Sequence, residues 1–430
     1  MTDLLSISVA MFAGLMMTRA VKNLHLPDVT AYLVAGVLIG PCLLGALGVP
    51  GLGFNSYEQL DRLAVISDLA LGFIAFSIGN EFRLEQLRET GRQAFIVGIA
   101  QAVVTTALVD LTLLLVHFAM PQAMTIPAVL TLGATATATA PAATLMVVRQ
   151  YKAKGPLTDL LLPIVALDDA VGLILFAVSF GVAKALSSGA VDVYTIIINP
   201  TIEIFASLLL GAAAGLGLSH LEKFFHSNTN RLAMTISFVF LTVALSMLSI
   251  PMGPATLGFS SLLVCMMLGT VFCNLCPLSK EIMDNADRWT APLLVLFFVI
   301  SGAQLELGVF QQLSSVVIGL VYIIFRSLGK YIGARESAKF AGCEEKVVEN
   351  LGITLLPQAG VALGMCVTAS TLPGDGTMIR NVVLFAVLVY QLVGPSMTKW
   401  ALTRAGDIQP KSREVLERRE RKLAAVAGKK

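Results

Sequence analysis

Two adjacent carboxylates lie inside an apolar segment. Asp168 and Asp169 fall within the hydrophobic run Leu160–Val182. An acidic residue at the centre of a bilayer costs about 2.5–3.5 kcal/mol on insertion scales, so such residues are retained where they bind an ion, carry a proton or pair with a cation. The pair therefore predicts a site that handles ions, with a purely structural ion pair as the alternative.

A cation on another helix should accompany this pair. Neighbouring residues of a helix point about 100° apart, so Asp168 and Asp169 cannot both face one ligand. Arg326 and Lys330 are the candidate partners, because they lie four residues apart on one face of a second apolar segment. We expect the deeper Arg326 to be the partner of Asp168. Lys330 either joins it or extends its ammonium group to the inner surface.

Two other apolar segments contain helix-breaking residues. Leu132–Ala143 reads LGATATATAPAA, and Leu356–Gly360 reads LPQAG. Proline removes a backbone donor and clashes with the preceding turn, which frees carbonyl groups. Freed carbonyls and threonine hydroxyls are suitable ligands for a hard cation. Breaks at matching positions in two halves are typical of inverted-repeat transporters with crossed discontinuous helices, although either break alone could be an ordinary kink.

The elements that position these residues are membrane helices. The chain is 56% hydrophobic and 13% charged, against about 25% charged residues in soluble domains. We predict thirteen spans, because backbone groups in lipid must be paired within helices. They lie near 3–20, 29–46, 62–80, 94–118, 123–148, 157–184, 195–219, 230–250, 254–275, 289–309, 313–333, 346–370 and 378–401.

The distribution of basic residues predicts the orientation. Lysine and arginine concentrate in alternate loops, which should be cytoplasmic. Thirteen spans then put the N-terminus outside and the C-terminus inside. We therefore expect a transmembrane domain over residues 1–402 and a basic cytoplasmic tail over 403–430, which could lie against anionic lipid.

Several classes of function are disfavoured by the residues. No nucleotide-binding fingerprint and no nucleophile, base and oxyanion constellation is found, so we expect neither an enzyme nor a cofactor. Six scattered cysteines give no disulfide framework, and the four histidines lack metal-ligand spacing. We expect no nucleic-acid partner. Ions and membrane lipid are the expected partners.

The sequence resembles the monovalent cation:proton antiporters of the cation:proton antiporter superfamily. The likeness covers nearly all of the membrane domain. It includes Leu26–Pro41, the threonine-rich break before Pro141, the Asp-Asp pair followed by Ala-Val-Gly, Phe297–Leu307 and the FRSLGK stretch that contains Arg326.

The resemblance implies a homodimer of thirteen-helix protomers, in which a core domain moves against a dimerisation domain. The core would comprise the helices at about 94–184 and 313–401, and the remaining helices would form the dimerisation domain. Asp169 would hold Na⁺ or K⁺ alternately with the proton, with Asp168 beside it and with Thr137 and Thr139 in the break. Such exchange would serve pH homeostasis at the cell membrane.

This mechanism needs only competition at Asp169. Desolvation favours the protonated carboxyl group, whereas a bound cation favours the ionised one. Relatives often have PRGE where this chain has Pro357–Gly360, so a charge is absent there. An Asp-Asp pair facing lysine is associated in the family with exchange of two protons per sodium. With Arg326 as the partner, which cannot release a proton, we expect that electroneutral exchange is open to this chain.

Three questions remain open at the level of sequence. Asp110, deep in the fourth predicted span, either lies on the proton path or makes an interhelical hydrogen bond. A sodium-coupled symporter of an organic anion could use a similar crossed-helix design, but would not need the aspartate pair. A passive channel would not need buried carboxylates paired to a cation. The choice among Na⁺, K⁺ and Li⁺ depends on cavity size and ligand number.

Overall fold

The chain folds into an assembly of membrane helices. The computed structural model describes residues 2–21, 28–49, 52–80, 82–85, 91–140, 144, 147–148, 151–187, 199–248, 250–252, 255–306 and 313–408. Nine of the described helices are long and apolar enough to cross a bilayer, and four shorter apolar helices accompany them. These helices correspond one for one to the predicted spans, so the predicted all-α membrane fold is confirmed.

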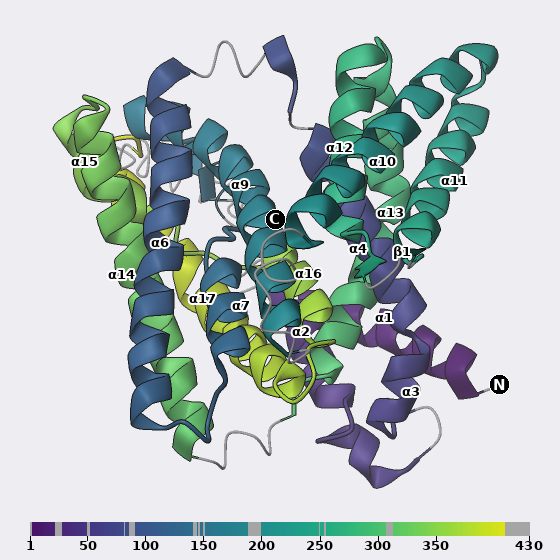
Figure 1. The fold of residues 1–430 in the computed structure, drawn as a ribbon, viewed down its shortest axis with the longest axis horizontal. Coiled ribbons are helices and arrows are strands. Elements are labelled where there is room, and N and C mark those ends of the chain that lie inside the picture. The colour runs from purple at the N-terminus through teal and green to yellow at the C-terminus, as the bar shows by residue number, and fades with distance from the viewer. Residues whose placement is uncertain are drawn as a thin grey trace, which may run out of the picture.

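The order of the elements can be followed by colour in Figure 1. The longer helices are α1 (Thr2–Ala20), α2 (Asp28–Ile39), α4 (Ala64–Asn80), α6 (Gly91–Ala119), α9 (Pro156–Ser187), α10 (Asn199–Leu221), α11 (Asn228–Ser246), α12 (Ser261–Leu275), α13 (Ser279–Ala303), α14 (Leu313–Phe340) and α17 (Gly376–Ala405). The shorter helices are α3 (Tyr57–Arg62), α7 (Ile126–Thr135), α15 (Glu345–Thr354) and α16 (Gly360–Ala369).

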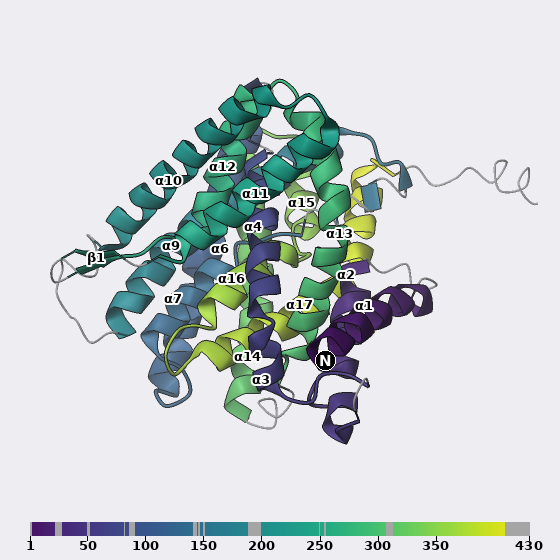
Figure 2. The same cartoon turned by 90° about the vertical axis from the view of Figure 1, so that its right-hand side faces the viewer.

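A small antiparallel hairpin interrupts this helical pattern. Strand β1 (Ile250–Met252) pairs with β2 (Ala255–Leu257) in the connection between α11 and α12. Figure 2 shows it at one edge of the helices. The predicted spans 230–250 and 254–275 include Ile250 and all of β2 and leave residues 251–252 between them, so the hairpin is a local correction to the predicted boundaries.

The helices pack as two groups, which stand on opposite sides of Figure 1. The core bundle consists of α6, α7, α9, α14, α15, α16 and α17, and its most extensive contact is between α6 and α14. The companion bundle consists of α1, α2, α4, α10, α11, α12 and α13, with α12 packed along both α10 and α4. The residues that could do chemistry are all on the core bundle.

Glycines hold the helices of each bundle close together. A Cβ atom added at Gly333 of α14 would lie 3.0 Å from the Cα of Gln101 on α6. In the companion bundle, a Cβ atom at Gly79 would lie only 1.9 Å from the carbonyl oxygen of Met266. Such approaches of backbone to backbone are the usual way in which membrane helices associate, because lipid provides no hydrophobic drive between them.

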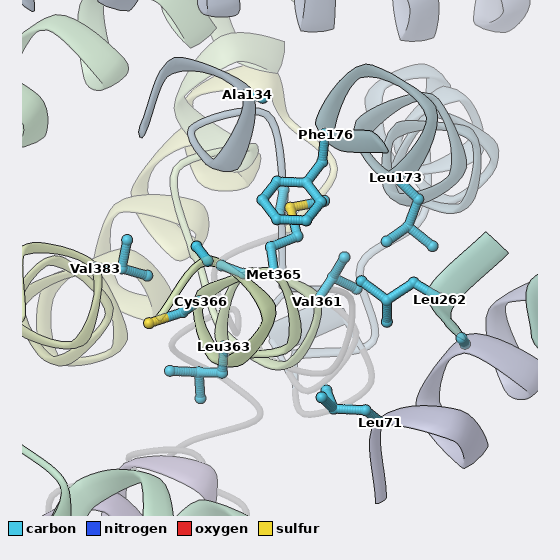
Figure 3. Close-up of a cluster of buried hydrophobic side chains, with 14 of the residues drawn as sticks. Leu71, Ala134, Leu173, Phe176, Leu262, Val361, Leu363, Met365, Cys366 and Val383 are labelled. Carbon is cyan, nitrogen blue, oxygen red and sulfur yellow. The ribbon is translucent and has the colours of Figure 1, made fainter. Parts of the chain in front are cut away.

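Around α16, the contact between the bundles is made of aliphatic side chains instead, while Glu306 after α13 is bound by Arg380 and Asn381 of α17 elsewhere. Figure 3 shows Leu262 of the companion bundle beside Val361 of α16, with Leu71 on the same side, while Met365 points the other way, toward Phe176 of α9. A Cβ atom at Gly364 of α16 would meet the end of the Leu71 side chain at 2.7 Å and that of Leu262 at 3.8 Å. This interface consists of side-chain surface, whereas the interfaces within the bundles bring backbones together.

Two spans are interrupted and touch each other. Helix α7 ends at Thr135 and residues 138–140 are not helical, while the predicted break residue Pro141 lies outside the described residues. Helices α15 and α16 flank the second break, which spans residues 355–359. The backbone N–H of Ala140 donates to the carbonyl of Pro357 at 2.8 Å. The predicted second break is therefore confirmed, and the two unwound stretches lie side by side.

Candidate functional site

Asp168 is the centre of a fully buried polar cluster. Its Oδ2 atom accepts a hydrogen bond from Lys330 Nζ at 2.7 Å and another from Thr139 Oγ1. Its Oδ1 atom accepts from Gln101 Nε2. The donors come from α14, from the unwound stretch after α7 and from α6. Three donors around two oxygens are the surroundings that suit an ionised carboxylate.

Lys330 is the ion-pair partner of Asp168, so the expectation that Arg326 takes this role is wrong. The side chain of Lys330 is fully buried, so its ammonium does not extend to the inner surface. Its Nζ atom also donates to the carbonyl of Thr137 and, at 3.0 Å, to Thr139 Oγ1. A compact ammonium with three donors fits a carboxylate, a carbonyl and a hydroxyl that converge on one point.

Arg326 binds backbone carbonyls of both unwound stretches. Its Nε and Nη2 atoms donate to the carbonyls of Ala136 at 2.9 Å and Ala138 at 2.7 Å, and Nη1 donates to Leu356 at 2.8 Å. The guanidinium carbon also lies 4.4 Å from the ring centre of Tyr390. A planar fork of donors can join three fixed acceptors in this way. Arg326 thus joins the two breaks to each other.

Freed carbonyls of both stretches accept hydrogen bonds. Carbonyls 135 to 138 accept in turn from Gln358, Arg326, Lys330 and Arg326, and carbonyls 356 to 358 accept from Arg326, Ala140 and Gln391. Carbonyls in lipid must be paired, and here polar side chains pair them where the helices end. These carbonyls, which we expected to serve as cation ligands, therefore already have protein donors.

Asp169 lies in the same buried region, with 2% of its surface exposed. Gly172 follows it by three residues and so lies on the same side of α9. A Cβ atom at Gly172 would be 2.6 Å from Thr137 Oγ1, so the absence of a side chain there makes room for the threonine. The hydroxyl of Thr137 donates to the carbonyl of Ala134 at 2.8 Å, which leaves its oxygen lone pairs as acceptors. The fold therefore brings the predicted threonines and carboxylates together.

Asp110 occupies a different part of the core bundle. It lies on α6 against Gly133 of α7, where an added Cβ atom would be 1.8 Å from Asp110 Oδ1. That oxygen is buried and accepts no hydrogen bond from any residue that the structure describes. The interhelical hydrogen bond expected as an alternative role is therefore not found for this atom in the described part of the chain.

Two glutamines of the site were missed by the sequence analysis. Gln101 contacts Asp168, and Gln358 donates at 3.0 Å both to the carbonyl of Thr135 and to the hydroxyl of Tyr322. Both glutamines are fully buried. A lone amide in an apolar span is a signal of the same kind as a lone carboxylate, since it too must be paired inside the membrane. Gln358 supplies two hydrogen bonds at the position where the expected charge is absent.

Known proteins of similar sequence and fold are sodium/proton antiporters. The chain is 23% identical over 402 residues to the high-affinity Na⁺/H⁺ antiporter NhaS3 of Synechocystis sp., covering 84% of this chain and 81% of that protein. Its fold is similar to two structures of the sodium proton antiporter MjNhaP1 from Methanocaldococcus jannaschii. The first has a TM-score of 0.72 and 16% identity, covering 95% of this chain and 99% of that one. The second has a TM-score of 0.62 and 15% identity, covering 94% and 98%.

The family model "sodium/hydrogen exchanger, transmembrane" matches residues 7–404. The chain therefore belongs to the sodium/hydrogen exchanger family, whose members are secondary transporters that exchange cations for protons and are not enzymes.

Proposed function

We propose that this protein exchanges a monovalent cation, Na⁺ or K⁺, for protons by alternating access, with Asp169 as the group that holds either ion. The observation that carries this assignment is the set of contacts of Asp168. Both of its oxygens bind donors from three other elements, among them Lys330 and Thr139. Exchange is therefore assigned to its neighbour, and Asp168 serves as the fixed anchor of the site.

Competition at one carboxylate couples the two fluxes. A cation stabilises the ionised form of Asp169, whereas burial stabilises the protonated form, so binding of one ion expels the other. Thr137 supplies a hydroxyl oxygen beside Gly172, one turn after Asp169, which is a suitable ligand for a hard cation. If only the occupied protein changes conformation, each cation that crosses one way requires protons to cross the other way.

The charge of Lys330 decides the stoichiometry. Lysine can release a proton when its surroundings change, whereas arginine cannot. The electroneutral exchange considered for an Arg326 partner loses its premise, because the ion pair is made by Lys330. We propose that a bound cation displaces one proton from Asp169 and a second from Lys330. Exchange of two protons for one sodium then moves net charge across the membrane.

Alternating access would be a movement of the core bundle against the companion bundle. Close backbone contacts, such as that between Gly333 and Gln101, make each bundle a unit. The interface between the bundles has a flexible leucine, Leu71, opposite Gly364. Aliphatic surfaces without interlocked backbones can slide at small cost, because dispersion contacts are non-directional. The companion bundle would then be the dimerisation domain of a homodimer, as the resemblance implies.

Asp110 is proposed as a station on the proton path. It is a carboxylate of the core bundle whose Oδ1 atom has no hydrogen-bond donor among the described residues. A proton can reside on such an oxygen without breaking an existing contact. Replacement by asparagine should slow proton-coupled exchange without changing cation affinity.

Liposome transport tests the proposed function. Purified protein is reconstituted with a pH dye inside, and sodium, potassium or lithium is added outside. Wild-type protein should release protons from the vesicles, and Asp169→Asn should not. The matched control is Asp159→Asn, the same substitution at an exposed position near the start of α9, which should behave as wild type. Folded wild-type protein that moves no protons with any cation would refute antiport and favour the sodium-coupled symporter.

Three further properties are proposed and have direct assays. An imposed membrane potential should drive sodium-coupled proton flux if two protons exchange for one sodium, and should have no effect on electroneutral exchange.

Cross-linking in native membranes should give a homodimer. A cysteine placed in the basic tail should react with a membrane-impermeant reagent only from the cytoplasmic side, with the N-terminus labelled from outside. In cells, such exchange would contribute to pH homeostasis.

A further inference from the structure

We propose that Gln101 is a positioning residue of the exchange site. Its carboxamide holds Asp168 against Lys330 and away from the cation, so that the cation is bound by Asp169 and is released readily. This inference rests on the proposed function and adds a determinant of cation affinity to it.

The hydrogen bonds of Gln101 fix the direction of its amide group. The Nε2 atom donates to the carbonyl of Gly98 at 3.1 Å and to Asp168 Oδ1. An amide nitrogen carries two protons, and both are used here. Both neighbours are acceptors, so the oxygen of the amide cannot take the place of its nitrogen. Only a donor at this position can hold the carboxylate.

The backbone of Gln101 is itself held by two neighbouring helices. On one side, a Cβ atom at Gly98 would lie 3.2 Å from the Cβ of Leu167 on α9, the residue before Asp168. On the other side, Gly333 of α14 approaches the Cα of Gln101. The side chain is fully buried, so it has no alternative partner in water. Gln101 thus projects from a rigid junction of three helices, as a residue that positions another must do.

The other contacts of Asp168 do not replace this one. Lys330 and Thr139 both bind Oδ2, and Gln101 is the donor to Oδ1 among the described residues. Without Gln101, the carboxylate keeps its ion pair but can rotate about it. A rotated Oδ1 could reach toward a cation held by Asp169, the adjacent residue on α9. The cation would then have an additional anionic ligand.

This geometry predicts a specific change in transport kinetics. Gln101→Leu keeps the approximate size of the side chain and removes the donor. The KM for sodium should fall about three- to tenfold, in the range of one hydrogen bond to a charged group. The kcat should fall by a similar factor, because a cation that is held more tightly leaves more slowly. Gln101→Glu should have a larger effect in the same direction, since it also adds negative charge.

A structural defect would give a different result. It would lower kcat and thermal stability without lowering KM. The matched control is Thr105→Val, which removes a buried hydroxyl one turn away on α6 that bonds only the carbonyl of Gln101 in the described structure. This control should leave the KM unchanged. Gln101→Asn keeps an amide that is shorter by one methylene, and should give an intermediate KM.

Sodium-dependent thermal stabilisation in detergent is a second readout that needs no transport. Tighter binding raises the melting temperature at a given sodium concentration. Gln101→Leu should therefore be stabilised by sodium at lower concentrations than wild type. Unchanged sodium dependence, or a raised KM, in folded Gln101→Leu would overturn the inference. If wild-type protein exchanges ions and Asp169→Asn does not, that outcome leaves the proposed function intact and removes only the role of Gln101.

Discussion

Lys330 and Arg326 lie four residues apart on α14, and Lys330 is the one that binds the carboxylate of Asp168. Arg326 donates to backbone carbonyls of Ala136, Ala138 and Leu356 instead. One helix thus carries two buried cations with different tasks. In the proposed mechanism Lys330 can change its charge and takes part in exchange, whereas the permanent charge of Arg326 stabilises the two unwound stretches that it joins.

Breaking the ion pair should destabilise the protein more than removing it. Asp168→Asn leaves Lys330 buried and unpaired, which costs about 3–5 kcal/mol. The double variant Asp168→Asn/Lys330→Met removes both charges and should recover much of that loss. Thermal unfolding in detergent measures the three variants as a double-mutant cycle. Strictly additive effects of the two substitutions would show that the pair is not energetically coupled.

Arg326 should be irreplaceable by lysine. A lysine at this position has a single ammonium group, which cannot reach carbonyls on both unwound stretches in the geometry of a planar fork. We expect Arg326→Lys to lower stability by about 2–4 kcal/mol, since buried carbonyls lose their donors. Arg404→Lys is the control, because Arg404 makes an exposed ion pair with Glu349. Such surface changes stay within about 0.5 kcal/mol. Equal melting temperatures for the two variants would contradict the proposed role of Arg326.

Acidification should weaken cation binding by competition. If one carboxylate holds either ion, each proton that binds Asp169 removes a cation site. The apparent KM for sodium should rise by up to about tenfold for each unit of falling pH where one proton competes with the cation, and more steeply where the second proton also competes, while the maximal rate at saturating sodium changes little. Initial rates across a grid of sodium concentration and pH provide the measurement. A maximal rate that falls with pH at constant KM would instead indicate separate sites for the two ions.

Bulk at the bundle interface should slow transport. The space at Gly364 is limited by Leu71 of the companion bundle, which a Cβ atom would meet at 2.7 Å. Gly364→Val should reduce the turnover rate several-fold, because the branched side chain would have to pass that leucine. Gly319→Val is the control, since a Cβ atom there meets only Phe385 of the same bundle, at 3.8 Å. Equal rates for the two variants would argue against movement at this interface.

Much of the fold is predictable from the sequence because hydropathy counts the spans directly. The second break also follows from local chemistry, since Pro357 cannot continue a helix. The partner of Asp168 was assigned wrongly for a physical reason. Arg326 and Lys330 share one face of α14, and which of them meets the carboxylate depends on the relative heights of α14 and α9. No pattern within either helix sets those heights.

Gln101 and Gln358, the uncharged members of the site, were not predicted for a similar reason. Gln101 lowers the hydropathy of its span too little to interrupt it, and its partner lies 67 residues away in the sequence. Gln358 lies where the resemblance implies a charge. The sequence therefore indicated that a charge is missing there, and it did not indicate a role for the amide. Both residues contact distant helices, and the sequence alone does not specify those contacts.

The paired carbonyls of the two breaks have a mechanical consequence. A stretch of backbone without helical hydrogen bonds would ordinarily be the most compliant part of a helix and would bend under load. Here the planar guanidinium group of Arg326 donates to the carbonyls of both Ala138 and Leu356, and the N–H of Ala140 donates to the carbonyl of Pro357. The crossing of the two unwound stretches is thus held rigid by these hydrogen bonds. A displacement of α14 should therefore move both half-helices and Asp168 with it, without bending at the breaks.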